Sequence, residues 1–194
     1  MFQYPNAASG LKKIFTSQIL AIAGAVMMIL PLINIIGLII ALAAVVLDFI
    51  GVLEASKDDD GYRKALSYTI AQFIASLILF FLPEGNVVYL LVDLADSVFG
   101  LMVLYHICHT TSRLLRLRHA NDIAAQGDRV WDINIKCLII TAVCTFICII
   151  PFINIIAIPA LLVTAIVNIY ACILYIIFIY NSYRRLETPF FIDY

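Results

Sequence analysis

Three carboxylates and one amide interrupt long apolar stretches of the sequence. Asp48, Asp93 and Asp96 lie within hydrophobic runs of the first two thirds of the chain, and Asn168 lies within the last run. A charged side chain at mid-membrane depth costs about 3 kcal/mol or more on insertion scales. These four residues are therefore the candidate intramembrane site, for protons or for a polar substrate. The alternative is that they form hydrogen bonds between packed helices, as Gln72 and Ser76 are expected to do.

A weaker candidate site contains two histidines and a glutamate. His106 and His109 are three residues apart and share one face of a helix, so they can in principle share a metal ion. Glu54 occupies the position of His106 when the repeats described below are aligned. Cys108 is two residues from His106 and points away from its face. Because histidines close to a membrane interface are ordinary, the sequence predicts no metal site and no cofactor.

The usual signatures of enzymes are absent from the sequence. There is no glycine-rich phosphate loop, no HExxH, no GxSxG and no CxxC. There is also no large polar region outside the hydrophobic stretches, so a catalytic site would have to lie among them. Catalysis is the third of three function classes, and we expect the protein not to be an enzyme.

The composition places the chain in a lipid bilayer. Of 194 residues 64% are hydrophobic and 13% are charged, with a mean hydropathy of +1.05. A soluble domain has roughly 25% charged residues and could not bury so much apolar surface. The net charge is −1, and no basic stripe interleaved with aromatic residues is present, so nucleic acid is not an expected partner.

A Pro-x-x-Asn element divides the apolar stretches into segments of membrane-spanning length. It occurs three times, as Pro31 with Asn34, as Pro83 with Asn86 and as Pro151 with Asn154. Proline ends a helix, and asparagine suits the N-cap of the next one. The sequence predicts an all-α integral membrane protein with six transmembrane helices. They form a single domain over residues 1–194, with three helical hairpins over about 11–56, 62–117 and 130–185.

The predicted helices follow from these stops and starts. Their approximate bounds are Leu11–Leu30, Ile35–Ala55, Tyr62–Leu82, Val87–Leu117, Trp131–Ile150 and Ile155–Arg185. Asp60 is the expected cap of the third helix, and Pro159 falls near the first turn of the last. The run from Lys57 to Gly61 is expected to be a solvated loop with local ion pairs, and 118–129 a polar loop.

Aligning the three hairpins on their prolines places polar or small residues at one depth. Asp48, Gly100 and Asn168 fall at the same position, and Asp96 lies one turn toward the corner from Gly100. This register suggests that the second, fourth and sixth helices surround a pseudo-threefold centre.

Positive charge is distributed to one side of every corner. All 12 lysines and arginines lie toward the hairpin ends that face away from the Pro-x-x-Asn corners. By the positive-inside rule both termini and the two charged loops are cytoplasmic, and the corners are outside, in a plasma (inner) membrane.

Five cysteines fall inside the apolar spans or toward their basic ends, so structural disulfides are not expected. Cys137, Thr141, Cys144 and Cys148 share one helix face, a pattern of small residues that favours close helix packing.

Two classes of function remain. The first is an interaction or accessory subunit of a membrane complex or of a homo-oligomer. The alternative is a small transporter or channel that uses the layer of Asp and Asn residues. Convergence of Asp48, Asp96 and Asn168 on one cavity would favour transport, and separate hydrogen bonds between helices would favour the accessory function.

Overall fold

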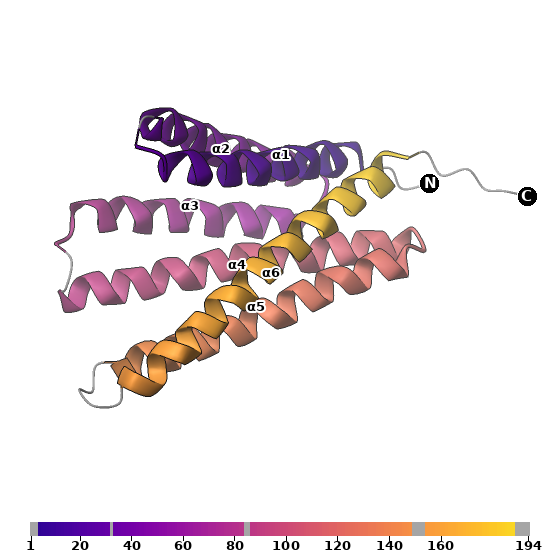
Figure 1. Ribbon diagram of the computed structural model, residues 1–194. Coiled ribbons are helices and arrows are strands. Elements are labelled where there is room, and N and C mark those ends of the chain that lie inside the picture. Colours follow the sequence, from indigo (N-terminus) through magenta and orange to yellow (C-terminus); the bar gives the residue numbers. More distant parts are fainter. Residues whose placement is uncertain (1–3, 32, 84–85, 149–153, 189–194) are drawn as a thin grey trace, which may run out of the picture.

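The computed structural model describes residues 4–31, 33–83, 86–148 and 154–188, with side chains left out of the description in 145–148 and 154–158. The described residues form six α-helices and contain no β-strand (Figure 1). The helices are α1 (Pro5–Met28), α2 (Asn34–Ala55), α3 (Asp60–Phe81), α4 (Val87–Leu117), α5 (Asn121–Cys148) and α6 (Asn154–Glu187). Five are long and apolar enough to cross a membrane, namely α1 to α4 and the part of α6 from Pro159. The predicted span 131–150 extends beyond the described residues.

Most of the predicted bounds are close to the observed ones, and α4 has the predicted bounds. Two predictions are wrong. The first helix was expected to begin at about Leu11, but Pro5 begins α1, because proline suits the first helical position. The polar loop 118–129 is a turn of only three residues, after which α5 begins at Asn121. In α6, Pro159 lies inside the helix, beyond the first turn.

The turn between α4 and α5 is short because His119 adopts a left-handed conformation, with φ of 57°. The Ala120 N–H donates to the Leu115 carbonyl, and the His119 N–H donates to the Arg116 carbonyl, each at 3.0 Å. This is the Schellman arrangement, in which glycine is the usual left-handed residue. A histidine there carries backbone strain that a glycine would not have.

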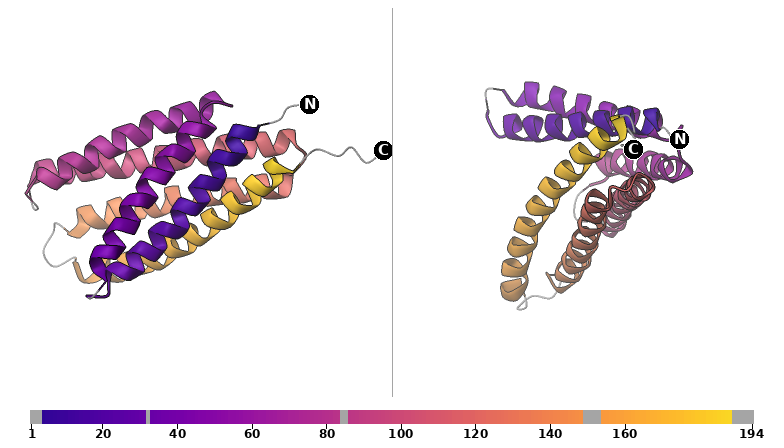
Figure 2. Two further views of the ribbon diagram at one scale, coloured as in Figure 1. Left: turned by 90° about the horizontal axis from the view of Figure 1, so that it is seen from above. Right: turned by 90° about the vertical axis from the view of Figure 1, so that its right-hand side faces the viewer.

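The helices pack mainly as consecutive pairs. The most extensive contacts join α1 with α2, α3 with α4, and α5 with α6, and smaller ones join α4 with α5, α1 with α6, and α2 with α3. Connections between pairs lie at one end of the molecule, which we call the charged end. The corners lie at the other, which we call the corner end (Figure 1). The second view in Figure 2 shows α6 diverging from α1 and α2 toward the corner end.

Small residues at seven-residue intervals form the contact between α1 and α2, which we call the glycine seam. Gly10, Ser17 and Gly24 line α1, and Gly37, Ala44 and Gly51 line α2; all six are buried. A Cβ on Gly10 would lie 2.4 Å from the Gly51 carbonyl oxygen, and one on Gly24 would lie 2.9 Å from that of Gly37. Glycine is required here because the backbones of the two helices touch.

The buried core lies at the charged end. Its fully buried large side chains come from all six helices and include Leu11, Ile14, Val52, Tyr62, Ile107, Leu114, Leu115, Val130, Phe178 and Ile179. The Tyr62 hydroxyl forms a 2.7 Å hydrogen bond with the Thr111 hydroxyl between α3 and α4. At the corner end the apolar side chains are exposed, with Phe80 at 82% and Ile29 at 79%. One end of the bundle is therefore packed like a domain core, and the other presents apolar side chains outward.

The charged segment between α2 and α3 joins three helices. Asp58 accepts hydrogen bonds from the Ala7 backbone N–H at 2.8 Å and from Asn6, and so stabilises the start of α1. Asp59 accepts from the Gly61 N–H at 2.7 Å and binds Arg113 of α4 through both carboxylate oxygens at 2.6 Å. The expected local ion pair is present between Asp60 and Arg63, but the other two carboxylates bind other helices, so the run is more than a solvated loop.

Two of the expected helix caps are also wrong. Asp59, and not Asp60, is the N-cap of α3. The N-cap position of α2 is Ile33, and Asn34 is the first helical residue, with no side-chain cap. Asn86 does cap α4, since its side-chain oxygen accepts from the Val88 N–H at 3.2 Å. Pro31 and Pro83 lie in the non-helical connections. Pro151 and the Asn154 side chain lie outside the described residues.

A buried arginine closes the charged end. Arg118 follows α4 and is only 7% exposed, and its Nη1 donates to the carbonyl oxygens of Arg185, Leu186 and Thr188 at 2.9–3.2 Å. Its Nε has no hydrogen-bond partner within the described residues. Burial lowers the pKa of this guanidinium. Arg118 thus caps the C-terminus of α6, where free carbonyls favour a cation.

Candidate functional site

Asp48 lies in the glycine seam. Its Oδ1 accepts a hydrogen bond from the Ser17 hydroxyl at 2.8 Å and lies 3.5 Å from the Gln18 amide nitrogen. The same hydroxyl also lies 2.7 Å from the Ile14 carbonyl oxygen, so a single proton serves two acceptors. Asp48 is therefore bonded within the α1–α2 pair.

Asp96 has an equivalent arrangement in the next pair. Its Oδ1 accepts from the Ser76 hydroxyl at 2.7 Å between α4 and α3. Nearby in the same pair, the Gln72 amide packs against Gly100, where a Cβ would lie 2.8 Å from Nε2. These polar side chains bind the two helices to each other.

Asp93 and Asn168 are exposed side chains. Neither has a hydrogen-bond or ion-pair partner within the part of the chain that the structure describes. Asn168 is 14 residues into α6, which places it roughly 21 Å along the helix from its start. Both residues are on segments of membrane-spanning character. Asn168 shares a helix face with the buried Thr164 and Ala171, so it is exposed where α6 diverges from the rest of the bundle.

The four residues do not form one site. Within the described residues α2 packs against α1 and α3, and it makes no contact with α4 or α6. Asp48 on α2 is thus separated from Asp96 on α4 and from Asn168 on α6. The even-numbered helices are not all neighbours, since only α4 and α6 share a contact, a minor one, so the pseudo-threefold centre stays a prediction.

Glu54 on α2 lies apart from His106 and His109, which are neighbours on α4. Glu54 forms an ion pair with Lys13 of α1. His106 stacks on Tyr68 at a ring-centroid distance of 5.4 Å, and His109 stacks on Tyr105 at 5.4 Å. No group of three His, Cys, Asp or Glu residues within the described ranges is arranged to hold a metal ion.

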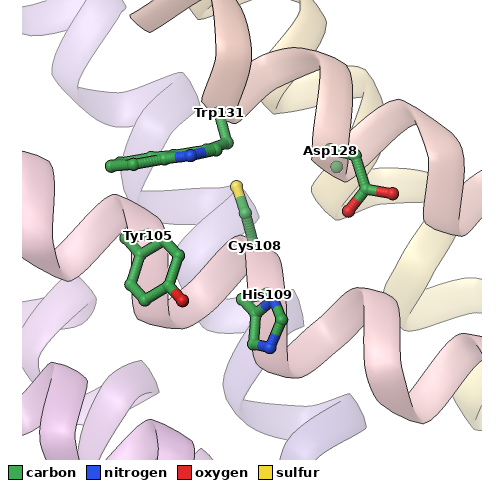
Figure 3. Close-up of a pocket in the computed structure, with 6 residues that line it drawn as sticks. Tyr105, Cys108, His109, Asp128 and Trp131 are labelled. Carbon is green, nitrogen blue, oxygen red and sulfur yellow. The ribbon is translucent and has the colours of Figure 1, made fainter. Parts of the chain in front are cut away.

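A small pocket lies between α4 and α5 at the charged end. Its volume is about 20 Å³, and it is lined by Tyr105, Cys108, His109, Gly127, Asp128 and Trp131. In Figure 3 the Cys108 thiol points toward the space between the Trp131 indole and Asp128. The Tyr105 and Trp131 ring centroids are 4.8 Å apart. We call this the α4–α5 pocket.

Sequence reasoning missed this pocket because 118–129 was predicted to be a loop. The lining residues have helical spacing on both sides, at 105, 108 and 109 and at 127, 128 and 131. Gly127 allows the approach, since a Cβ there would lie 2.4 Å from the Ser112 hydroxyl oxygen. The aromatic–acidic spacing around Trp131 was the signal that could have revealed one wall of the pocket.

Comparison with protein-family models, with curated proteins and with solved structures finds no match to this chain.

Proposed function

We propose that this protein is a multi-pass membrane protein that acts as an interaction or accessory subunit, either in a complex of membrane proteins or as a homo-oligomer. The observation that carries this proposal is Asn168, an exposed amide on the apolar helix α6 without a partner in the described residues. An amide in hydrocarbon lacks the hydrogen bonds that water provides, and a side chain from a neighbouring subunit can restore them.

The exposed apolar side chains of the corner end support the same proposal. Lipid alone can cover them, but a bundle that is packed at one end only has lateral faces available for other membrane helices. Asp93 is a second exposed polar side chain on an apolar helix. By contrast, Asp48 and Asp96 are each bonded within their own helix pair, and separate bonds of this kind favour an accessory function.

The proposed topology has six spans in three hairpins, with both termini and the charged end cytoplasmic, the corners outside, and the chain in a plasma (inner) membrane. It is supported by the distribution of the 12 basic residues. Fusing a reporter that is active only in the cytoplasm to the C-terminus, and separately to the 82–86 connection, tests it. Activity is expected from the first fusion and not from the second.

Substituting Asn168→Leu tests the proposed association. The full-length protein, extracted in mild detergent, is expected to migrate with a mass above that of one chain, and the variant is expected to lose about tenfold or more in association. Asn134→Leu is the matched control, because the Asn134 amide donates to the Val130 carbonyl of its own helix at 2.8 Å. A single-chain mass for the wild type, or equal association of both variants, would contradict the proposal.

A small transporter or channel is the second candidate. It would use Asp48, whose carboxylate in the α1–α2 pair accepts from Ser17 and lies 3.5 Å from the Gln18 amide nitrogen. Asp48→Asn and Asp96→Asn in a reconstituted flux assay distinguish the two candidates. Flux that falls with either substitution would favour transport, and unchanged flux would remove the carboxylates from any pathway.

A further inference from the structure

The α4–α5 pocket lies at a depth where lipid headgroups meet hydrocarbon. Tyr105 is 18 residues from the start of α4 at the corner end, a rise of roughly 27 Å, and a hydrocarbon core is about 30 Å thick. Tyrosine and tryptophan are enriched at this boundary. A ligand that enters the pocket from the side therefore comes from the headgroup layer.

The lining of the pocket favours a cation. The faces of aromatic rings carry partial negative charge, and Tyr105 and Trp131 form one wall. Asp128 adds a carboxylate at the rim, with about half of its side chain exposed. The floor consists of the buried Cys108 and Gly127, and His109, stacked on Tyr105, completes the lining.

The small volume of the pocket favours a small cationic group over a large one. A cavity of about 20 Å³ has room for one group the size of a water molecule. A primary ammonium has that size, whereas a trimethylammonium is several times larger. The pocket thus matches an ethanolamine headgroup better than a choline headgroup.

Arg116 provides the complementary charge. Its guanidinium forms an ion pair with Asp128 while 47% of its side chain stays exposed, so donors remain free toward the headgroup layer. A guanidinium binds phosphate oxygens well. The ion pair therefore presents a negative and a positive group side by side, as a zwitterionic headgroup requires.

We propose that the α4–α5 pocket binds the headgroup of an aminophospholipid, with the primary ammonium against Trp131, Tyr105 and Asp128 and the phosphate on Arg116. This requires that the chain lie in a membrane, but it does not depend on the accessory function.

Trp131 is the only tryptophan of the chain, so its fluorescence reports on this pocket directly. The test adds short-chain phosphatidylethanolamine, phosphatidylcholine or phosphatidylglycerol to the full-length protein in detergent. Saturable change in Trp131 emission is expected with the ethanolamine lipid. Binding of the other two lipids is expected to be at least about tenfold weaker, the equivalent of 1.4 kcal/mol.

Asp128→Asn is expected to weaken binding of the ethanolamine lipid about tenfold. The matched control is Asp132→Asn, one turn away on α5, where the carboxylate is paired with Lys136 and does not line the pocket. That control is expected to bind within twofold of wild type. Since both ion pairs are exposed, neither substitution is expected to unfold the protein.

Equal responses to all three lipids would overturn the proposal, because they would reflect general immersion of Trp131 in lipid. Preference for the choline lipid, or wild-type binding by Asp128→Asn, would overturn it as well. The lipid comparison uses the wild-type protein, so it decides the question even if a variant is unstable. Loss of association in Asn168→Leu leaves these results unchanged, so the two proposals fail separately.

Discussion

Replacing Gly10 with alanine tests whether backbone contact in the glycine seam holds α1 against α2. The added Cβ would lie 2.4 Å from the Gly51 carbonyl oxygen and 2.7 Å from the Ala55 backbone nitrogen. Ordinary carbon contacts are about 3.5–4.0 Å. Because both neighbours are backbone atoms of a helix, no side chain can rotate away, and the two helices must separate by roughly 1 Å.

The magnitude follows from two opposing effects. Overpacking of a well-packed contact costs about 1–3 kcal/mol. Alanine in place of glycine within a helix contributes up to about 1 kcal/mol of stability. We therefore expect Gly10→Ala to lower the free energy of unfolding by about 1–2 kcal/mol, which for a chain of this size lowers Tm by about 2–8 °C.

Gly100→Ala is the matched control. A Cβ there would lie 2.8 Å from the Gln72 amide nitrogen, the far end of a side chain that can rotate. The helix propensity of alanine then dominates, and this variant is expected to be as stable as wild type or more stable.

Thermal unfolding in detergent, followed with a thiol-reactive dye, measures both variants. Cys108, Cys137 and Cys144 are buried and become reactive on unfolding. The background protein carries serine in place of Cys172, which is exposed, and of Cys148. Gly10→Ala as stable as Gly100→Ala would refute backbone contact as the basis of the seam.

Three further substitutions, one of them with a matched control, test the charged end by the same thermal assay. His119→Gly is expected to stabilise the protein by about 1 kcal/mol, because glycine adopts the left-handed conformation of that residue without strain. An unchanged Tm would contradict the strained left-handed turn. Asp59→Ala is expected to destabilise the protein by about 1–2 kcal/mol, because it removes the α3 cap and the ion pair to α4. The control Asp60→Ala removes only an exposed ion pair and should change stability by less than about 0.5 kcal/mol. Equal effects of the two substitutions would show that the cap contributes nothing. Arg118→Gln is expected to destabilise the protein by about 2–3 kcal/mol, because the carbonyl oxygens at the end of α6 lose their charged donor. Carboxypeptidase should then remove the C-terminal tail faster. An unchanged digestion rate would mean that the end of α6 is stable without this cation.

Much of the helical architecture could be predicted from the sequence because it depends on local rules. Pro31, Pro83 and Asn86 mark ends and starts, and the bounds of α4 follow from composition alone. One prediction failed because a contact distant in sequence contributed to the outcome. Asp59 caps α3 in place of Asp60, and it also binds Arg113 more than fifty residues away.

The candidate site was less predictable than the helices. Alignment of the repeats placed Asp48, Gly100 and Asn168 at one position, but position along a helix does not say which helices are neighbours. The contacts place Asp48 within the α1–α2 pair and leave Asn168 exposed. The α4–α5 pocket was missed because it depends on a three-residue turn whose left-handed residue is a histidine, which carries no glycine signal.

The sequence by itself determined the helical character, the apolar segments long enough to span a membrane, and the polar residues within them, because apolar composition, prolines and charges act through local free energies. Only the tertiary structure decided what each costly residue does. Ser17 meets Asp48 because glycines bring two backbones into contact, and Trp131 meets Tyr105 because α5 begins ten residues before that tryptophan. These side-chain contacts depend on how the helices pair in three dimensions, which neither periodicity nor composition encodes.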